Sequence, residues 1–276
     1  MSKQHLKIEK RDLHFVNRTE TRITDEEPSP DNPYLAETCR YFGYDLLELA
    51  RKRSFADVVF LLLSGELPTP EQGSLLETLM VSFINPGPRH PATRAAMNAG
   101  VGRTFPAHIL PIGLSVLGGS HLGGEEVTAA MRFLRLQKKK EPAEVAVALL
   151  EEQGRPAEGD WRIAPGFGSR FGGIDPIPQK IANLLFTMPG SGSALEWGQE
   201  FVLALASREL GWLATGVCAA VFCDLGFHPR VGPGLFQILS APGILAHGLE
   251  LANKPMTAMP FPDEEHYIIA PEARNG

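Results

Sequence analysis

Large hydrophobic residues recur at helical spacing along most of the chain. Residues 45–50 predict one helix, and residues 55–63 predict a second that is apolar on nearly all sides and therefore buried. Ser54 precedes the second helix and Asp57 follows three positions later, the spacing at which a capping box satisfies free amide groups. The Thr-Pro-Glu-Gln sequence of residues 69–72 predicts the start of a third helix in the same way.

The rest of the chain continues this helical pattern. No clear run of alternating polar and apolar residues appears, although residues 1–33 predict short strands or coil. Further helical segments are expected at residues 92–117, 125–136, 141–152, 179–188, 211–225 and 233–251, the last interrupted at Pro242. Residues 154–162 are expected to form a linker. The sequence therefore predicts an all-α protein in which residues 122–224 form a smaller lobe.

Composition and charge exclude several classes of function. The chain has 276 residues, of which 43% are hydrophobic, so it can bury a full core. Its net charge is −6 and no basic face is clustered, which argues against a nucleic-acid partner and favours small molecules or proteins. The three cysteines lack metal-ligand spacing, so we expect reduced, structural thiols and no metal site. With neither a signal peptide nor an apolar run that could span a bilayer, we expect a cytoplasmic protein without a membrane partner.

Two glycine-rich turns carry the candidate chemistry. Residues 118–124 place four glycines around His121, where backbone can approach a ligand and an imidazole can exchange a proton. A second turn, Pro-Gly-Phe-Gly-Ser-Arg, covers residues 165–170. We interpret the pair as two walls of one cleft, although glycine-flanked histidines also occur in ordinary helix connections. The lysines at 138–140 fit a solvated helix end, or alternatively a contact with a ligand phosphate.

Several segments of this chain resemble the citrate synthase family. They match, in order, the family's amino-terminal signature, its histidine turn, its coenzyme A loop and its carboxy-terminal helix. The segments are residues 40–50 with 61–69, 118–121, 165–168 and 236–250. The resemblance covers about residues 36–252. The short length and the tail at residues 267–272 look more like the citryl-CoA lyase branch than like full-length synthases.

This resemblance implies a citrate synthase-like fold with a large and a smaller helical domain. Residues 1–121 and 225–276 would form the large domain and residues 122–224 the small one, with the active-site cleft between them. The family implies a homodimer and an acyltransferase or a lyase. Its co-substrate is a coenzyme A thioester, used with a carboxylic acid, and no cofactor is permanently bound.

The resemblance also assigns roles to individual residues. His121 falls on the histidine that polarises the thioester carbonyl as it becomes an enolate. The expected coenzyme A contacts are Pro165, Gly166, Phe167, Gly168 and Arg170. The candidates for binding the partner acid are His90, Arg94 and Ser240.

Several family positions are substituted in this chain. Ser169 replaces the second catalytic histidine, and Trp212 replaces the aspartate that removes the α-proton, although tryptophan cannot act as a base. Ser240 replaces a carboxylate-binding arginine, and Ile177 stands near the position of another. The losses predict a partner acid with fewer carboxylates than oxaloacetate or citrate.

Two hypotheses follow from these substitutions. In the first, the chain is an enzyme that forms or cleaves a carbon–carbon bond of an acyl-CoA, with its acid or base recruited from another position. The candidates for that acid or base are Arg170, Asp175, His90 and Glu125. In the second, the chain is a non-catalytic, coenzyme A-binding or regulatory homologue.

Overall fold

The computed structural model describes residues 20–260, 262–263 and 265–267. Within them lie eleven α-helices, two 3-10 helices and two small three-stranded sheets. The predicted all-α fold is therefore confirmed, with the sheets as minor additions. The chain divides into two units, Met1–Leu67 and Pro68–Gly276.

The first unit contains an antiparallel sheet followed by two helices. Its elements are β1 (Thr24–Pro28), β2 (Ala36–Tyr41), β3 (Tyr44–Asp45), α1 (Leu46–Lys52) and α2 (Phe55–Ser64). The sheet has the order β1-β2-β3, and Phe42 and Gly43 form the tight turn between β2 and β3. Both turn residues have positive φ, 48° and 86°, as a two-residue hairpin turn requires. The strands predicted for residues 1–33 are found in β1, while residues 1–19 lie outside the described part of the chain.

The predicted caps of this unit are present. The Asp45 side chain accepts a hydrogen bond from the Glu48 amide at 2.9 Å, and Ser54 and Asp57 form the capping box of α2. α2 buries Val59 and Phe60, but Phe55 is 72% exposed in the single chain. The prediction that this helix is buried on all sides was therefore wrong for its outer face.

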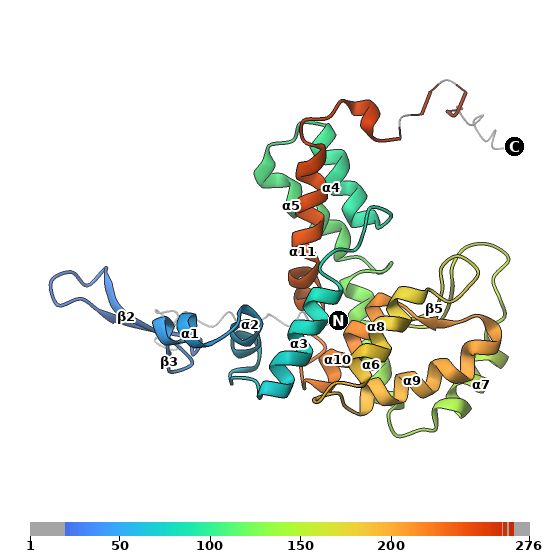
Figure 1. Cartoon of the computed structure of the whole chain (residues 1–276), viewed down its shortest axis with the longest axis horizontal. Coiled ribbons are helices and arrows are strands. Elements are labelled where there is room, and N and C mark those ends of the chain that lie inside the picture. Colours follow the sequence, from blue (N-terminus) through green and yellow to red (C-terminus); the bar gives the residue numbers. More distant parts are fainter. Residues whose placement is uncertain (1–19, 261, 264, 268–276) are drawn as a thin grey trace, which may run out of the picture. The chain divides into compact units, whose positions relative to one another are not determined.

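The second unit contains most of the helices. They are α3 (Pro70–Ser82), α4 (Pro91–Val101), α5 (Pro106–Leu117), α6 (Gly124–Gln137), α7 (Pro142–Glu152), α8 (Pro176–Phe186), α9 (Ser193–Leu205), α10 (Ala214–Asp224) and α11 (Gly232–Leu251). Short 3-10 helices occur at η1 (Ala206–Arg208) and η2 (Met256–Ala258). Figure 1 shows α4, α5 and α11 grouped together, and α6 to α10 grouped around the second sheet.

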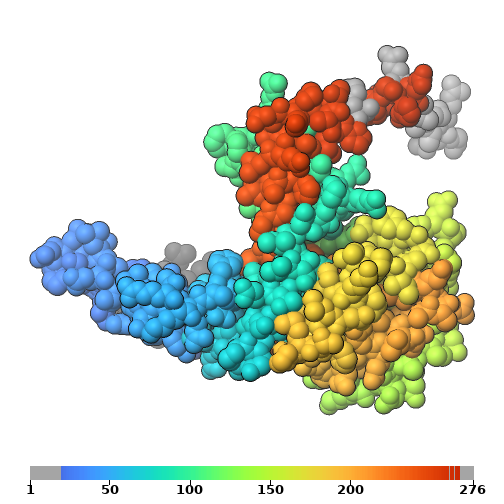
Figure 2. Space-filling view, viewed as in Figure 1, coloured from blue at the N-terminus to red at the C-terminus, as the bar shows by residue number. Residues whose placement is uncertain are grey.

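α11 packs closely against α4 and α5, as the space-filling view also shows (Figure 2). A Cβ added to Gly100 of α4 would collide with the backbone carbonyl of Gly248 in α11. A Cβ added to Gly113 of α5 would similarly collide with the side chain of Ile244 in α11. The helices can approach this closely because these positions carry no side chain.

Pro242 lies inside α11, which nevertheless continues from Gly232 to Leu251. The predicted interruption is thus a local irregularity rather than a helix end. Just after the proline, the amide of Gly243 donates a hydrogen bond to the carbonyl of Ile84, at 3.0 Å. A proline ring displaces the preceding turn of a helix, and here a neighbouring segment supplies an acceptor at that point.

The second sheet consists of β4 (Trp161–Ala164), β5 (Phe167–Ser169) and β6 (Gly211–Trp212), all antiparallel. Gly166, with φ of 81°, forms the turn between β4 and β5 and lies directly against Gly216 at the start of α10. A side chain at either glycine would separate the sheet from that helix. The segment 154–162, which we expected to be a linker, therefore ends in a strand.

α9 was missed in the sequence analysis, and its cap explains why. The amides of Gly192, Ala194 and Leu195 donate hydrogen bonds of 2.8–3.0 Å to the carboxylate of Asp224, at the far end of α10. A cap supplied from a distant residue leaves no local sequence signal.

Two predicted helix starts were displaced. The helix expected from residue 179 begins at Pro176, because Asp175 caps it and a proline suits the first turn. The helix expected from residue 211 begins at Ala214, because residues 211 and 212 pair with β5. The predicted large and small domains stay a prediction.

Candidate functional site

A pocket of about 270 Å³ lies in the second unit and collects residues from several helices. We call it the Arg170 pocket. Its walls come from the segment after α3, the start of α4, the start of α8, the start of α10 and the middle of α11. The residues that matter for its chemistry are His90, Leu122, Arg170, Asp175, Leu213 and Ser240.

Two residues that line the Arg170 pocket each have a buried polar atom with no hydrogen-bond partner among the described residues. These atoms are Nε of Arg170 and Oγ of Ser240, and the whole Ser240 residue is only 1% exposed. Buried polar groups are nearly always paired in folded proteins, and one left unpaired costs about 1–3 kcal/mol. Arg170 and Ser240 both line this cavity, so we consider it a candidate site for a polar ligand, although a side chain must move before a ligand can reach either of the two buried atoms.

His90 is buried at the start of α4 and uses both of its ring nitrogens. Nδ1 accepts a hydrogen bond from the Ala92 amide at 3.2 Å, so the proton resides on Nε2, which is 3.1 Å from the carbonyl oxygen of Leu122. Burial lowers the pKa of His90, and the positive charge of Arg170 acts in the same direction. His90 is therefore a neutral group that holds the Leu122 carbonyl in place.

Leu122 occupies the left-handed region, with φ of 58°, which is unusual for a side chain of this size. Two side chains stabilise this backbone. The amide of Leu122 donates a 2.9 Å hydrogen bond to Glu126, while its carbonyl accepts one from His90. The turn that carries His121 is thus fixed from both sides.

His121 lies in a small cluster of charged side chains rather than in the Arg170 pocket. Nη2 of Arg162 approaches Nδ1 of His121 at 2.6 Å, and Asp160 lies 3.6 Å from Nε2. Nη1 of Arg162 is 3.3 Å from the carboxylate of Glu126. Because a guanidinium group only donates, Nδ1 of His121 must accept, and the neutral ring then carries its proton on Nε2. That side chain is 57% exposed, so this proton can reach a ligand.

A second pocket, of about 330 Å³, lies on the other side of the histidine turn. We call it the Pro165 pocket. Ser120, Glu126, Arg162 and Pro165 contribute to its wall, so it adjoins the charged cluster around His121. Ser120 lines this pocket and Leu122 lines the Arg170 pocket, which places His121 between the two in sequence.

The structure brings together only part of the predicted site. His90, Arg170 and Ser240 line one pocket with Asp175 and Ile177, whereas the exposed Arg94 does not line it. In the predicted coenzyme A loop, Pro165 lines the neighbouring pocket. Gly166, Phe167 and Gly168 instead form the turn and strand, with Phe167 fully buried.

Trp212 and Ser169, which the resemblance predicts to replace catalytic residues of the family, both make contacts within the fold. Trp212 is 0% exposed, its ring lies 4.6 Å from that of Phe167, and its Nε1 donates to Gln199 at 3.1 Å. Its immediate neighbours Leu213 and Ala214 line the Arg170 pocket, but its own side chain does not. The Ser169 hydroxyl donates to the carbonyl of Gly173 at 3.0 Å.

Sequence reasoning missed the residues that surround His121. Asp160 and Arg162 are two positions apart on and beside β4, so their side chains reach the same side of the strand. Recognising the segment as a strand rather than a linker would have paired them. No cluster that could ligate a metal occurs among the described residues, and none of the described helices is long and apolar enough to cross a membrane.

Comparisons with known proteins identify the fold. The family described as citrate synthase, C-terminal domain, matches residues 13–134. The solved citryl-CoA lyase from Hydrogenobacter thermophilus is similar with a TM-score of 0.72 and 26% identity, over 91% of this chain and 94% of that one. No curated protein matches the sequence.

Two more distant solved structures share the fold. ATP citrate lyase from Methanothrix soehngenii, solved with citrate and coenzyme A, has a TM-score of 0.67 and 18% identity. The match covers 95% of this chain and 44% of that one. Citrate synthase from Thermoplasma acidophilum, solved with carboxymethyl coenzyme A and oxaloacetate, has a TM-score of 0.56 and 20% identity, over 78% of this chain and 59% of that one.

Proposed function

We propose that this chain, which resembles the citrate synthase family and has its fold, is an enzyme that forms or cleaves a carbon–carbon bond of an acyl-CoA. The observation that carries the proposal is the pair of unpartnered polar atoms, Arg170 Nε and Ser240 Oγ, in residues that line one pocket. Condensation and cleavage pass through the same enolate, so one site can serve both directions.

The partner acid of this reaction carries one carboxylate. Arg170 supplies the positive charge among the residues that line the Arg170 pocket, and a guanidinium group can bind a carboxylate through two parallel hydrogen bonds. Much of the remaining wall is apolar and includes Phe83, Leu213 and Phe236. This environment favours a small 2-oxo monocarboxylic acid over oxaloacetate or citrate, whose further carboxylates would lie among apolar side chains.

The coenzyme A part of the substrate occupies the Pro165 pocket. The pocket adjoins the His121 cluster, and the relatives solved with coenzyme A compounds share this fold. In this arrangement the Nε2–H group of His121 donates a hydrogen bond to the thioester carbonyl oxygen as that oxygen gains negative charge. Asp175 is the carboxylate that lines the Arg170 pocket, which makes it the candidate base for the α-proton.

The proposed homodimer is supported by the outer face of α5. Phe105 before this helix is 70% exposed, and Val116 and Ile112 are 42% and 36% exposed. A run of exposed apolar side chains on one helix is typical of a surface that pairs with another chain.

The test is release of free thiol from acetyl-CoA in the presence of glyoxylate, pyruvate, 2-oxoglutarate or oxaloacetate. We expect the monocarboxylic acids to be preferred. His121→Ala and Arg170→Ala should each abolish turnover, whereas the matched surface variants His266→Ala and Arg132→Ala should retain it.

Unchanged turnover in His121→Ala and Arg170→Ala would refute the site assignment. Coenzyme A binding without turnover of any acyl-CoA would instead support the non-catalytic alternative. The binding measurement separates the two results because it does not depend on finding the natural acid.

A further inference from the structure

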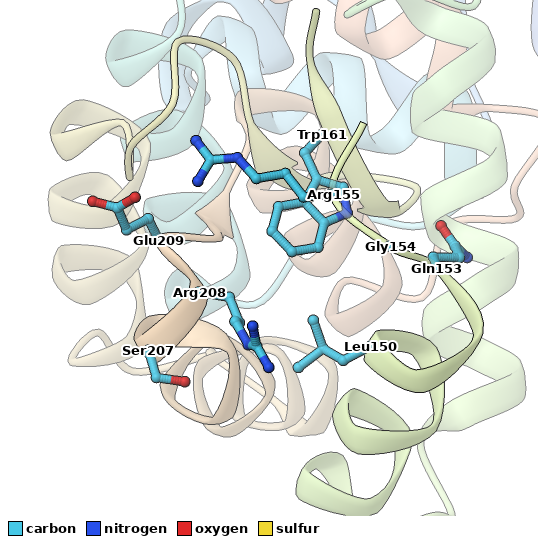
Figure 3. A pocket seen from close by; sticks show the side chains of 8 residues that line it. All are labelled: Leu150, Gln153, Gly154, Arg155, Trp161, Ser207, Arg208 and Glu209. Carbon is cyan, nitrogen blue, oxygen red and sulfur yellow. The ribbon is translucent and has the colours of Figure 1, made fainter. Parts of the chain in front are cut away.

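A larger pocket, of about 470 Å³, lies apart from the Arg170 pocket and shares none of its residues. We call it the Trp161 pocket. It is built from the end of α7, the following loop, β4 and the 3-10 turn before β6. Figure 3 shows its side chains, with the indole ring of Trp161 at the centre, Arg155 and Glu209 on one side and Arg208 with Leu150 on the other. None of these residues has a role in the proposed reaction.

Two arginines, Arg155 and Arg208, line the Trp161 pocket. Neither Arg155 nor Arg208 forms an ion pair or a side-chain hydrogen bond within the part of the chain that the structure describes. Glu209 is the carboxylate among the lining residues, so the pocket is net positive in a chain of net charge −6. Two guanidinium groups facing one cavity favour a doubly charged anion such as a phosphate.

Trp161 supplies a flat apolar surface between these charges, as Figure 3 shows. Its indole Nε1 is inaccessible to solvent and has no hydrogen-bond partner among the described residues. A ligand in the pocket would therefore contact the exposed part of the ring and not Nε1. Aromatic rings of this kind also stack on nucleobases, whatever the base.

The residues around the ring are held by regular structure. Trp161 pairs with Ser169 across β4 and β5, and Arg208 ends η1 just before the strand β6. Ser169 lines a separate, much smaller pocket that shares Arg155, Trp161 and Arg208 with the Trp161 pocket. Ser169, which the resemblance aligns with the family's loop histidine, therefore lines this smaller pocket and not the Arg170 pocket.

We infer that the Trp161 pocket binds a nucleotide. Arg155 and Arg208 hold its phosphates, the Trp161 ring stacks on its base, and Glu209 accepts a hydrogen bond from a hydroxyl or amino group. A pocket of about 470 Å³ lies within the range, roughly 300–1,000 Å³, that holds ligands of this size. The inference rests on these residues alone and does not require the proposed acyl-CoA reaction.

The test is binding of ADP to the full chain, measured by titration calorimetry and by quenching of tryptophan fluorescence, with coenzyme A present in excess. The excess coenzyme A separates this site from any site for the adenine nucleotide of coenzyme A itself. Trp161→Phe removes the quenching, since Trp197 and Trp212 are 5% and 0% exposed. Arg155→Ala and Arg208→Ala each weaken ADP binding roughly tenfold or more.

The matched control is Arg132→Ala, an exposed arginine of α6 outside every pocket described above; it leaves ADP binding unchanged. Adenosine and inorganic phosphate alone bind more weakly than ADP, because each engages one half of the pocket. Three results would overturn the inference: no ADP binding at about 1 mM, complete displacement of ADP by coenzyme A, or equal affinity of the arginine variants and the unmodified protein. Circular dichroism of each variant verifies that it is folded.

Discussion

Trp212 is predicted to be a core residue on which the fold depends, although the sequence resemblance aligns it with the family's catalytic aspartate. The test is a pair of substitutions, Trp212→Ala and Trp212→Phe. The side chain is 0% exposed, and the ring of Phe167 lies 4.6 Å away. On the other side α9 passes so closely that Gly198 has no room for a Cβ beside the indole.

The expected cost follows from these contacts. Truncating a buried tryptophan to alanine costs about 3–5 kcal/mol of unfolding free energy, and the lost ring contact with Phe167 contributes about 1 kcal/mol of that. The lost hydrogen bond adds little, because Gln199 Oε1 also accepts from Gln179 at 3.3 Å. We expect Trp212→Ala to cost about 4 kcal/mol and Trp212→Phe about 2 kcal/mol.

Urea unfolding followed by circular dichroism measures both values without depending on tryptophan emission. Leu136→Ala is the control, because Leu136 is 74% exposed and its loss should change stability by less than about 0.5 kcal/mol. A loss below about 1 kcal/mol for Trp212→Ala would show that the ring is not packed as described. Trp212→Asp should unfold the protein rather than restore a base, since its carboxylate would be buried among aromatic rings.

Two further predictions concern His90 and Asp224. Burial lowers the pKa of His90 below its usual value of 6.5, so the unfolded chain binds more protons as the pH falls below that value. The stability that neutral His90 contributes is thus complete above pH 6.5 and is lost as the pH falls through the folded pKa. Urea unfolding at about pH 7.5 and at about pH 5 measures this loss. The unfolding free energy should fall less between the two pH values for His90→Asn than for the unmodified protein. Asp224→Ala removes three hydrogen bonds at the start of α9 and should lower the unfolding free energy by about 2–4 kcal/mol, with Asp224→Asn intermediate; equal stability of all three proteins would contradict the capping role.

Local signals in the sequence were sufficient for the helices that carry their own caps. Ser54 with Asp57 and Thr69 with Gln72 form capping boxes within four residues, so the start of each helix can be read directly. α9 lacks such a signal because Asp224 caps it from the end of another helix. A helix whose cap comes from a distant residue cannot be located from its own stretch of sequence.

The candidate site likewise combines residues that are recognisable in the sequence with contacts that only the fold creates. The glycine-rich turn around His121 is visible in the sequence, and so is Arg170. That Arg162 donates to His121 is not visible, since it depends on residues 161–164 forming a strand with β5. The pairing of Arg170 with Ser240 in one pocket likewise requires the packing of α11 against its neighbours.

The contact between Gly100 and Gly248 has a consequence for how specificity can evolve. α4 begins next to His90 and α11 carries Ser240, so the crossing of these two helices sets how far apart two walls of the cavity stand. A methyl group introduced at the crossing would push the two helices apart and change the shape of the Arg170 pocket without altering any side chain that lines it. The width of this cavity is thus set in part by two glycines that lie more than two helical turns from His90 and Ser240.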